Sequence, residues 1–182
     1  MLTRAEVGPI LNACGHPKHR MMLTPCYGCG LRLHELVSLK IRDIDGERRL
    51  LRVEQGKGAK DRLVPLSETL LQQLRAYWRL YRPRDWLFPG LNRRKPLSET
   101  SIQKAFTQAK AQAAIGKVGG IHGLRHAYAT HQLEAGLPVH GLQRLLGHDN
   151  IQSTLRYVHW VPDYREGQGA HDLVAALEVD HD

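Results

Sequence analysis

Residues 49–66 place the strongest constraint on the fold, because the hydrophobic pattern changes there from a helical period to an alternating one. Residues 49–54 and 62–66 have the alternation of two short strands. The glycine-rich segment Gly56–Asp61 lies between them and fits a hairpin loop. The sequence therefore predicts one small antiparallel sheet, and the helical spacing elsewhere excludes a Rossmann-like series of βαβ units.

The rest of the chain shows helical spacing of its apolar residues. Thr3 and Glu6 form a capping-box pattern, and Ser67 caps a helix with one apolar face. That face consists of Leu70, Leu71, Leu74, Tyr77 and Trp78. The expected helices cover residues 3–14, 19–30 with a break or kink at Pro25, 31–39, 67–81, 98 or 100 to 115, 122–135, 138–146, 151–160 and 172–178. With a short edge strand at Trp86–Phe88, the fold class is α+β and mainly helical.

The chain has 182 residues, which fits one domain with a short appendage. We assign residues 1–162 to the domain and residues 163–182 to a tail that carries the last short helix. The hydrophobic fraction is 42%, no apolar run approaches the roughly 18 residues of a membrane span, and the N-terminus shows no signal-peptide core. These features predict a cytoplasmic protein. Its three cysteines, at 14, 26 and 29, are expected to be reduced thiols.

The formal net charge of +8 is unevenly distributed. The tail holds one basic residue, Arg165, and six acidic ones, at positions 163, 166, 172, 178, 180 and 182. The domain is therefore strongly basic and the tail acidic. This pattern favours a polyanionic partner such as nucleic acid, although a basic globular protein without such a partner is the simpler alternative.

Six polar residues, dispersed along the chain, form a set suited to phosphodiester chemistry: Arg32, Lys57, His122, Arg125, His148 and Tyr157. Displacement at phosphorus needs cations at the phosphoryl oxygens and a proton donor at the leaving oxygen. Arginine binds two phosphate oxygens in a planar fork, whereas lysine and histidine can carry a proton. Tyrosine can serve as a covalent nucleophile. The set needs neither a metal nor a cofactor.

The order and spacing of these residues resemble the tyrosine recombinases, the phage-integrase and Xer-like family. The resemblance runs from about residue 2 to about residue 160 and rests on four segments: GLRLHEL at 30–36, GKGAKDRLVPL at 56–66, HGLRHAYATH at 122–131, and LLGH at 145–148 with STLRY at 153–157. Each segment alone is weak. Four in order, at these intervals, are specific, and they imply a tyrosine-recombinase catalytic domain.

The resemblance implies which residues bind the phosphate. Arg32 and Arg125 would clamp the scissile phosphate, and His148 would donate a hydrogen bond to a phosphoryl oxygen. Glu35 matches an acidic position of the family that supports the first arginine. His34 departs from the Ser or Ala that members often carry, which adds bulk beside that arginine.

The resemblance also implies how the bond is broken. Tyr157 would attack to give a 3′-phosphotyrosyl bond and a free 5′ hydroxyl, and the retained bond energy would allow rejoining without ATP. Lys57 would protonate the leaving 5′ oxygen, with Lys60 as its competitor for that role. His122 would exchange a proton with the tyrosine.

Double-stranded DNA is the implied partner, with a monomer expected in free solution and a tetramer on DNA. Candidate DNA contacts are Lys60, Arg62, Arg93, Arg94 and Lys95, although Arg93–Lys95 fits a solvated charged loop equally well. Family members usually carry an N-terminal core-binding domain, which we expect to be absent here. DNA binding should then be weak and salt-dependent.

Several motifs have simpler explanations than a site. His122 and His126 have metal-ligand spacing, but Arg125 between them would repel a cation. The CxxC of Cys26 and Cys29 lacks a second pair and fits helix packing better. The Gly-Lys-Gly of the loop lacks the spacing of a P-loop. We expect surface or capping roles for two other histidines, His131 and His140.

Two alternatives to recombination stay open. A type IB topoisomerase-like activity would use the same chemistry on one duplex, and a remnant of a mobile element would bind DNA without cutting it. Tyr27, Tyr128 and Tyr164 are less suited than Tyr157 to be the nucleophile, because none follows a Gly-His by nine residues. The main competing role for Tyr157 is that of a buried structural tyrosine. A metal-dependent nuclease is disfavoured, because no acidic cluster has ligand spacing.

Overall fold

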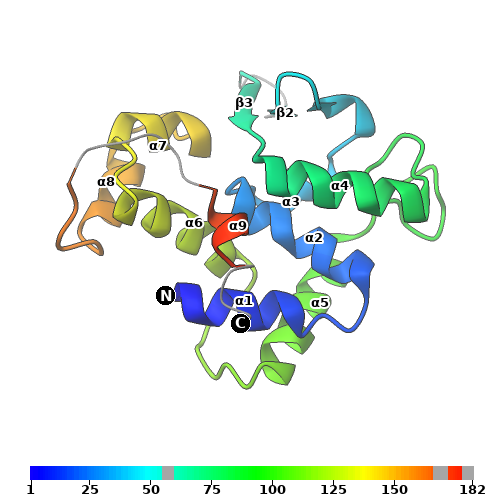
Figure 1. The fold of residues 1–182 in the computed structure, drawn as a ribbon, viewed down its shortest axis with the longest axis horizontal. Coiled ribbons are helices and arrows are strands. Elements are labelled where there is room, and N and C mark those ends of the chain that lie inside the picture. Colours follow the sequence, from blue (N-terminus) through cyan, green and yellow to red (C-terminus); the bar gives the residue numbers. More distant parts are fainter. Residues whose placement is uncertain (55–59, 166–171, 178–182) are drawn as a thin grey trace.

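The computed structural model describes residues 1–54, 60–165 and 172–177, and these are mainly helical with one small sheet (Figure 1). This confirms the predicted fold class. The helices are α1 Arg4–Asn12, α2 Pro17–Gly28, α3 Leu33–Val37, α4 Glu68–Tyr81, α5 Glu99–Gln112, α6 His122–Glu134, α7 Val139–Leu146, α8 Gln152–Val158 and α9 Leu173–Ala176, with a 3₁₀ turn at Ile41–Asp43. None of the helices in these ranges is long and apolar enough to cross a membrane.

The sheet has three antiparallel strands in the order β1-β2-β3: β1 Ile44–Asp45, β2 Leu50–Val53 and β3 Arg62–Pro65. The two predicted strands are confirmed, and β1 was missed because two residues carry no periodic signal. Leu51 pairs with Val64, and Val53 pairs with Arg62. The alternation in β3 turns Arg62 and Val64 towards the interior and leaves the residues between and after them exposed.

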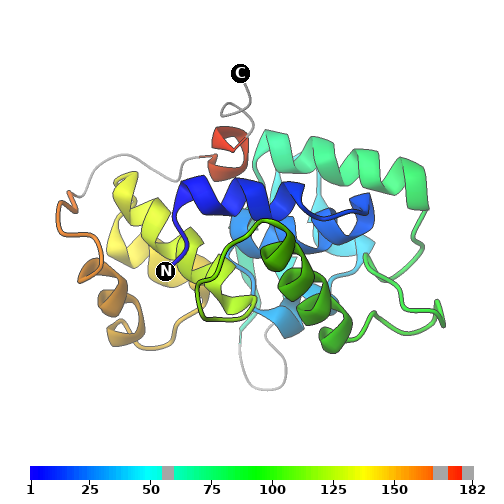
Figure 2. The ribbon, with the colours of Figure 1, turned by 90° about the horizontal axis from the view of Figure 1, so that it is seen from below.

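Helix α2 lies at the centre of the molecule and packs against α1, α4, α5, α6 and α9 (Figures 1 and 2). An interruption or a kink was expected at Pro25, but the helix continues through this residue to Gly28. Its buried face includes Met22, Leu23, Cys26 and Tyr27. Cys26 and Cys29 are free thiols, and burial raises the pKa of Cys29 to about 12. Both are therefore packing residues, as expected.

The turn between α2 and α3 depends on Gly30. This residue has a φ of +62°, a region that L side chains rarely adopt, and a Cβ there would overlap the ring of Tyr128. The carbonyl of Gly30 accepts a hydrogen bond from Arg125. A glycine at this position therefore allows the chain to pass close to α6 and brings the start of α3 beside it.

Two side chains lie differently from prediction. Trp78 is 41% exposed and lies under the guanidinium of Arg82, because the apolar face of α4 is narrower than expected. His131 is buried and its Nδ1 is 3.0 Å from the hydroxyl of Tyr27, so it is a core residue rather than a surface one. His140 is exposed as expected. At Trp86–Phe88 the expected edge strand is reduced to a single bridge between Lys40 and Trp86.

The C-terminal helix α9 is shorter than predicted and docks on its own chain. Its N-cap carboxylate, Asp172, accepts a hydrogen bond from the amide of Ala175. Leu173, Val174 and Leu177 are buried, and α9 packs against α2, α4 and α6. The described part of the C-terminal tail therefore packs in cis, on the domain of its own chain.

We predict that Gly30→Ala destabilises the fold by about 2–4 kcal/mol, from the left-handed backbone and the overlap with Tyr128 together. Urea denaturation gives the change. Gly15→Ala is the matched control, because no atom lies within 4 Å of a Cβ there, and it should stay within about 0.5 kcal/mol of the parent. Equal stability of the two variants would contradict this account of the turn.

Candidate active site

One buried carboxylate, that of Glu35 on α3, is shared by three arginines. Arg62 binds both of its oxygens, at 2.7 and 2.9 Å. Arg32 donates from Nη1 at 2.9 Å and also from its backbone amide at 2.8 Å, which closes a capping turn at the start of α3. Arg125 lies 3.8 Å away. We call these four residues the arginine cluster; at neutral pH it carries a net charge of +2, as an anion site requires.

The Glu35 carboxyl keeps its negative charge despite its position. Burial acts to raise its pKa, but the hydrogen bonds and charge of Arg62, the backbone amide of Arg32 and the charge of Arg125 outweigh burial and lower the pKa to about 2. The carboxylate is therefore ionised throughout the physiological range and can orient its partners.

Arg62 lies in the cluster, and this corrects its expected role as a DNA contact. It is buried, and its Nε donates to the carbonyl of Leu145 at 2.7 Å while its other two nitrogens bind Glu35. It therefore joins β3 to α3 and to the end of α7. The alternation of Arg62, Val64 and Leu66 already places the arginine on the inward face, a signal that its positive charge obscured.

Arg125 projects from the first turns of α6 into the interior. Its Nη1 donates to the carbonyl of Gly30, and its Nη2 donates to the carbonyl of Leu146 at 2.7 Å and to Nε2 of His148 at 3.2 Å. Burial and the neighbouring charge of Arg32 lower the pKa of Arg125 to about 10, against the opposing charge of Glu35, so it stays protonated at pH 7.

Arg32 is the accessible member of the cluster. Its side chain is 31% exposed, and its Nη2 makes one long contact of 3.4 Å to the carbonyl of Gly147. Gly147 caps α7 in the left-handed conformation, which turns that carbonyl towards the cluster. Arg32 therefore retains donor capacity for a ligand at the surface of the site.

His148 lies between Arg125 and the hydroxyl of Thr154. Because a guanidinium can only donate, Nε2 of His148 accepts, and Nδ1 carries the proton and lies 2.8 Å from Oγ1 of Thr154. Burial and the charges of Arg125, Arg32 and Arg156 lower the pKa of His148 to about 4. The imidazole is thus neutral, and since a hydroxyl can also donate, Thr154 allows the tautomer with a proton on Nε2.

Tyr157 on α8 is buried, with 1% of its surface exposed. Its ring stacks parallel to that of His148, with 6.4 Å between the two ring centroids. Its hydroxyl oxygen lies 2.8 Å from Nδ1 of His126, and Arg156 donates to it at 3.5 Å. In the sequence, the spacing of His126 from His122 indicated only a possible metal ligand, and no motif singled out Arg156. The signal for His126 was its position one residue after Arg125 on α6, but spacing alone does not pair it with α8.

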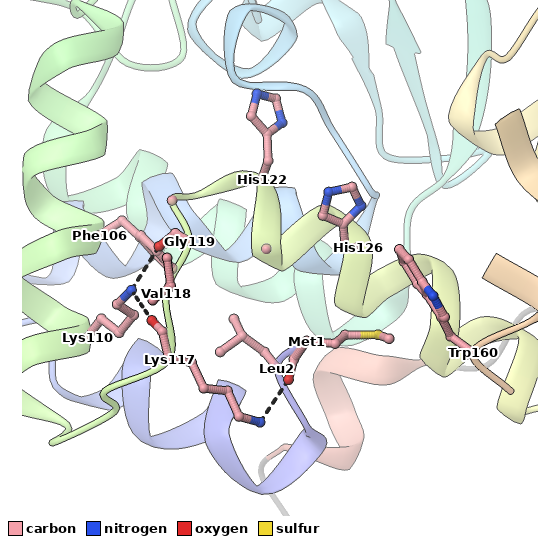
Figure 3. A pocket seen from close by; sticks show the side chains of 12 residues that line it. Met1, Leu2, Phe106, Lys110, Lys117, Val118, Gly119, His122, His126 and Trp160 are labelled. Carbon is pink, nitrogen blue, oxygen red and sulfur yellow. Dashed lines mark hydrogen bonds between the residues drawn. The ribbon is translucent and has the colours of Figure 1, made fainter. Parts of the chain in front are cut away.

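A pocket of about 430 Å³ is lined by His126 together with His122 and Trp160. Figure 3 shows His126 beside Trp160 at its edge, with His122 directed away from them. Other lining residues include Leu2, Phe106, Lys110 and Val118. His122 is exposed, and no hydrogen bond joins it to Tyr157 within the part of the chain that the structure describes.

The structure does not bring every predicted residue to the cluster. Lys57 lies outside the described residues. Lys60 is exposed just before β3. Arg93–Lys95 is exposed in the loop between α4 and α5, at the opposite end of the molecule from α7 and α8 (Figure 1). Among the residues that are described, no group of three or more His, Cys, Asp and Glu side chains is arranged to hold a metal ion.

Comparison with known proteins identifies this arrangement. The sequence model of the phage integrase family matches residues 1–162. The chain belongs to the phage integrase family. A putative integrase/recombinase of Sinorhizobium fredii is 45% identical over 158 residues, which cover 87% of this chain and 51% of that protein. The tyrosine recombinase XerA of Thermococcus onnurineus is 38% identical over 97% of this chain and 64% of its own length.

Solved structures of family members have the same fold. The crystal structure of a XerA recombinase superposes with a TM-score of 0.79 at 27% identity, over 99% of this chain and 64% of that one. The catalytic domain of bacteriophage HP1 integrase gives 0.69 at 25% identity, over 88% and 87%. A XerH site-specific recombinase bound to its difH substrate gives 0.76 at 23% identity, over 89% and 50%. The chain thus spans about half to two thirds of the length of the curated relatives it matches.

We predict that the pH dependence of stability reports the Glu35 charge. Because its pKa is lowered in the fold, the carboxylate stabilises the native state above about pH 4.5, and this contribution is lost as the pH falls towards 2. The stability difference between the parent and Glu35→Gln should therefore shrink by about 2 kcal/mol between pH 6 and pH 3. Urea titrations at both pH values measure it, and a constant difference would contradict the assignment.

Arg62→Ala should destabilise the fold by about 3–5 kcal/mol, because it removes the bidentate partner of a buried carboxylate. Arg94→Ala is the control: that side chain is exposed, and its loss should change the free energy of unfolding by less than about 0.5 kcal/mol. If Arg62→Ala matched the control in chemical denaturation, Arg62 would have to be treated as a surface residue.

Proposed function

We propose that this domain breaks and rejoins DNA strands in site-specific recombination, such as integration or excision, through a covalent tyrosine intermediate. The observation that supports this most strongly is the meeting of residues that are distant in sequence. The arginine cluster, His148 and Tyr157 come from α3 and its N-cap, β3, α6, the turn after α7, and α8, and they form one site. Cations around one position with a tyrosine ring beside them fit a phosphoryl-transfer site.

In this proposal Arg32 and Arg125 bind the scissile phosphate. Glu35 fixes both guanidiniums before DNA arrives, so little reorganisation is required in the transition state. When Arg125 turns its Nη2 towards a phosphoryl oxygen, His148 loses that donor and can present a protonated Nε2 to the same phosphate. Removal of one such donor typically costs about 3–4 kcal/mol of transition-state stabilisation.

Tyr157 then attacks phosphorus, and the 5′ oxygen leaves. The product is a 3′-phosphotyrosyl bond with a free 5′ hydroxyl, and the reverse attack rejoins a strand without ATP. Two further roles rest on the resemblance of their motifs. Lys57 is the acid for the leaving oxygen, with Lys60 as its competitor, and His122 exchanges a proton with the tyrosine. Tyr157 is assigned as nucleophile because its ring stacks on His148, whereas the hydroxyls of Tyr27 and Tyr164 bind His131 and the carbonyl of Leu137.

Double-stranded DNA as the partner is supported by the basic balance of the domain and by the XerH relative solved with its difH substrate. Lys60 is exposed near the sheet and suits a backbone phosphate contact, and Arg93–Lys95 suits one at a distance. The same proposal predicts a monomer in free solution, a tetramer on DNA and a cytoplasmic location. It also predicts the division into a domain at 1–162 and a tail.

A covalent adduct tests the proposal. The protein is incubated at low salt, with EDTA, with supercoiled plasmid and a pool of nicked duplexes, and SDS-resistant protein–DNA species are measured. We expect an adduct from the parent and none from Tyr157→Phe. Tyr81→Phe is the control, because Tyr81 lies on α4 and binds His16, so it should form the adduct normally.

The products distinguish the alternatives. Relaxed plasmid without products joined between molecules would support the topoisomerase-like activity. DNA binding without any adduct, also at nicks, would contradict the proposal and favour a remnant that only binds. Adduct formation by Tyr157→Phe would show that another residue is the nucleophile.

A further inference from the structure

We infer that a second DNA duplex binds to an arginine-rich surface on α4 and the β1–β2 turn, so that one copy of the chain can hold two duplexes together. This surface, which we call the α4 patch, consists of Arg48, Arg49, Arg75, Arg79 and Arg82. None of these arginines has a role in the proposed function. The inference takes from that function only that the polyanion is duplex DNA, and it concerns binding rather than cleavage.

The α4 patch is formed by one side of α4 and the turn beside it. Four buried residues of α4 face the core, and a second side lines a groove against α2. The remaining side carries Arg75, Arg79 and Arg82, whose spacing of four and three residues places them along one face. Nη2 of Arg75 lies 3.4 Å from the position of a Cβ at Gly46, and the other two arginines follow Gly46 in the turn. The five side chains therefore share one surface.

The patch is strongly positive and largely unpaired. All five arginine side chains are exposed. Within the described residues, the only ion pair of these arginines joins Arg48 to Asp45, at 4.0 Å. The guanidinium of Arg82 lies 4.2 Å from the ring centroid of Trp78, a contact that neutralises no charge. Such a surface attracts a polyanion, and arginine binds phosphate oxygens in a planar fork.

Two arginines of the patch occupy backbone positions that favour glycine. Arg49 has a φ of +53° and Arg82 a φ of +47°, and Ala114 is the only other described non-glycine residue with a positive φ. Arg82 is the C-cap residue of α4, a place near which glycine commonly ends a helix. An L side chain strains the backbone in this region. Strain at two arginines of one surface, neither of which forms an ion pair with a described residue, indicates a role for their side chains outside the fold.

The α4 patch lies away from the active site. Figure 2 shows α4 on the upper side of the molecule in that view and α8, which carries Tyr157, on the lower side. In Figure 1 the C-terminal half of α4 and α7 lie at opposite ends. Arg32, the accessible member of the arginine cluster, contacts Gly147 at the end of α7. A duplex held by the arginine cluster therefore leaves the patch open to a second duplex.

Duplex DNA suits the patch better than the other polyanion at hand, the acidic tail of a second copy. Arg75 and Arg79 are about 6 Å apart along α4, and Arg82 continues the row, so the positive charges repeat as phosphates do along a strand. In the described part of the tail, the Asp172 carboxylate caps α9, and Leu173 is buried on its own domain. That part of the tail is therefore not available to a second copy.

DNA bridging tests the inference. The Tyr157→Phe protein, which should not cleave, is bound to a duplex on beads, unbound protein is washed away, and capture of a second, labelled duplex is measured. We expect capture, and a loss of about tenfold or more when Arg75, Arg79 and Arg82 are all changed to Ser, since each phosphate contact contributes about 0.9 to the slope of log K against log salt. Arg20→Ser, an exposed position on α2, is the control and should capture the second duplex like the parent.

A second variant removes charge from the patch without loss of stability. Glycine adopts the left-handed backbone of Arg49 and Arg82 without strain, so the variant with both Arg49→Gly and Arg82→Gly should melt at the parent temperature or above it. Its capture of the second duplex should nevertheless fall by about tenfold or more. A glycine variant that captures like the parent would show that these side chains have no part in DNA binding.

Three results would overturn the inference: no capture of a second duplex by the unaltered patch, equal capture by the serine variant, or loss of capture when residues 178–182 are removed from a chain with an intact patch. The last would assign the patch to the acidic tail of a second copy. Cleavage is measured separately, as adduct formation with Tyr157 restored, and the patch variants should match the parent. Absence of adduct from the parent would contradict the proposed function and would leave the bridging result in place.

Discussion

The structure depends on a single buried carboxylate that is bound by three arginines. Glu35 cannot be buried without compensation, because an unpaired buried charge is costly, and the arginines cannot lie so close together without a counter-charge. The carboxylate and the arginines therefore stabilise each other's charge. These ion pairs hold the sheet, α3 and α6 in one arrangement, and the accessible edge of the cluster keeps a positive charge.

The same interaction separates structural from functional donors. Each guanidinium nitrogen of Arg62 donates a hydrogen bond to Glu35 or to the carbonyl of Leu145, so the role of this arginine is structural. Arg32 keeps donor capacity at the surface, and Arg125 makes a contact to His148 that a phosphate can replace. The cluster can bind an anion because Arg62 neutralises the Glu35 carboxylate. The positive charges of Arg32 and Arg125 then stay available for a ligand.

The helices, their caps and the hairpin strands were predictable, because each leaves a periodic or local signal in the sequence. The spacing of residues around Arg125 and Tyr157 also pointed to the family, since whole motifs carry that information. Contacts across the core were not predictable. The burial of Arg62 and His131 and the pairing of His126 with Tyr157 depend on how α6, α8 and the sheet pack, and this packing is encoded in no single segment.

Identification of the amino acid that becomes linked to DNA tests the central claim most directly. The adduct is digested with nuclease and protease, and the peptide that carries a nucleotide is sequenced by mass spectrometry. The account predicts a nucleotide joined through its 3′ phosphate to the oxygen of Tyr157. Linkage to any other residue, or through a 5′ phosphate, would contradict it, because the site described here would then not be where the strand is cut.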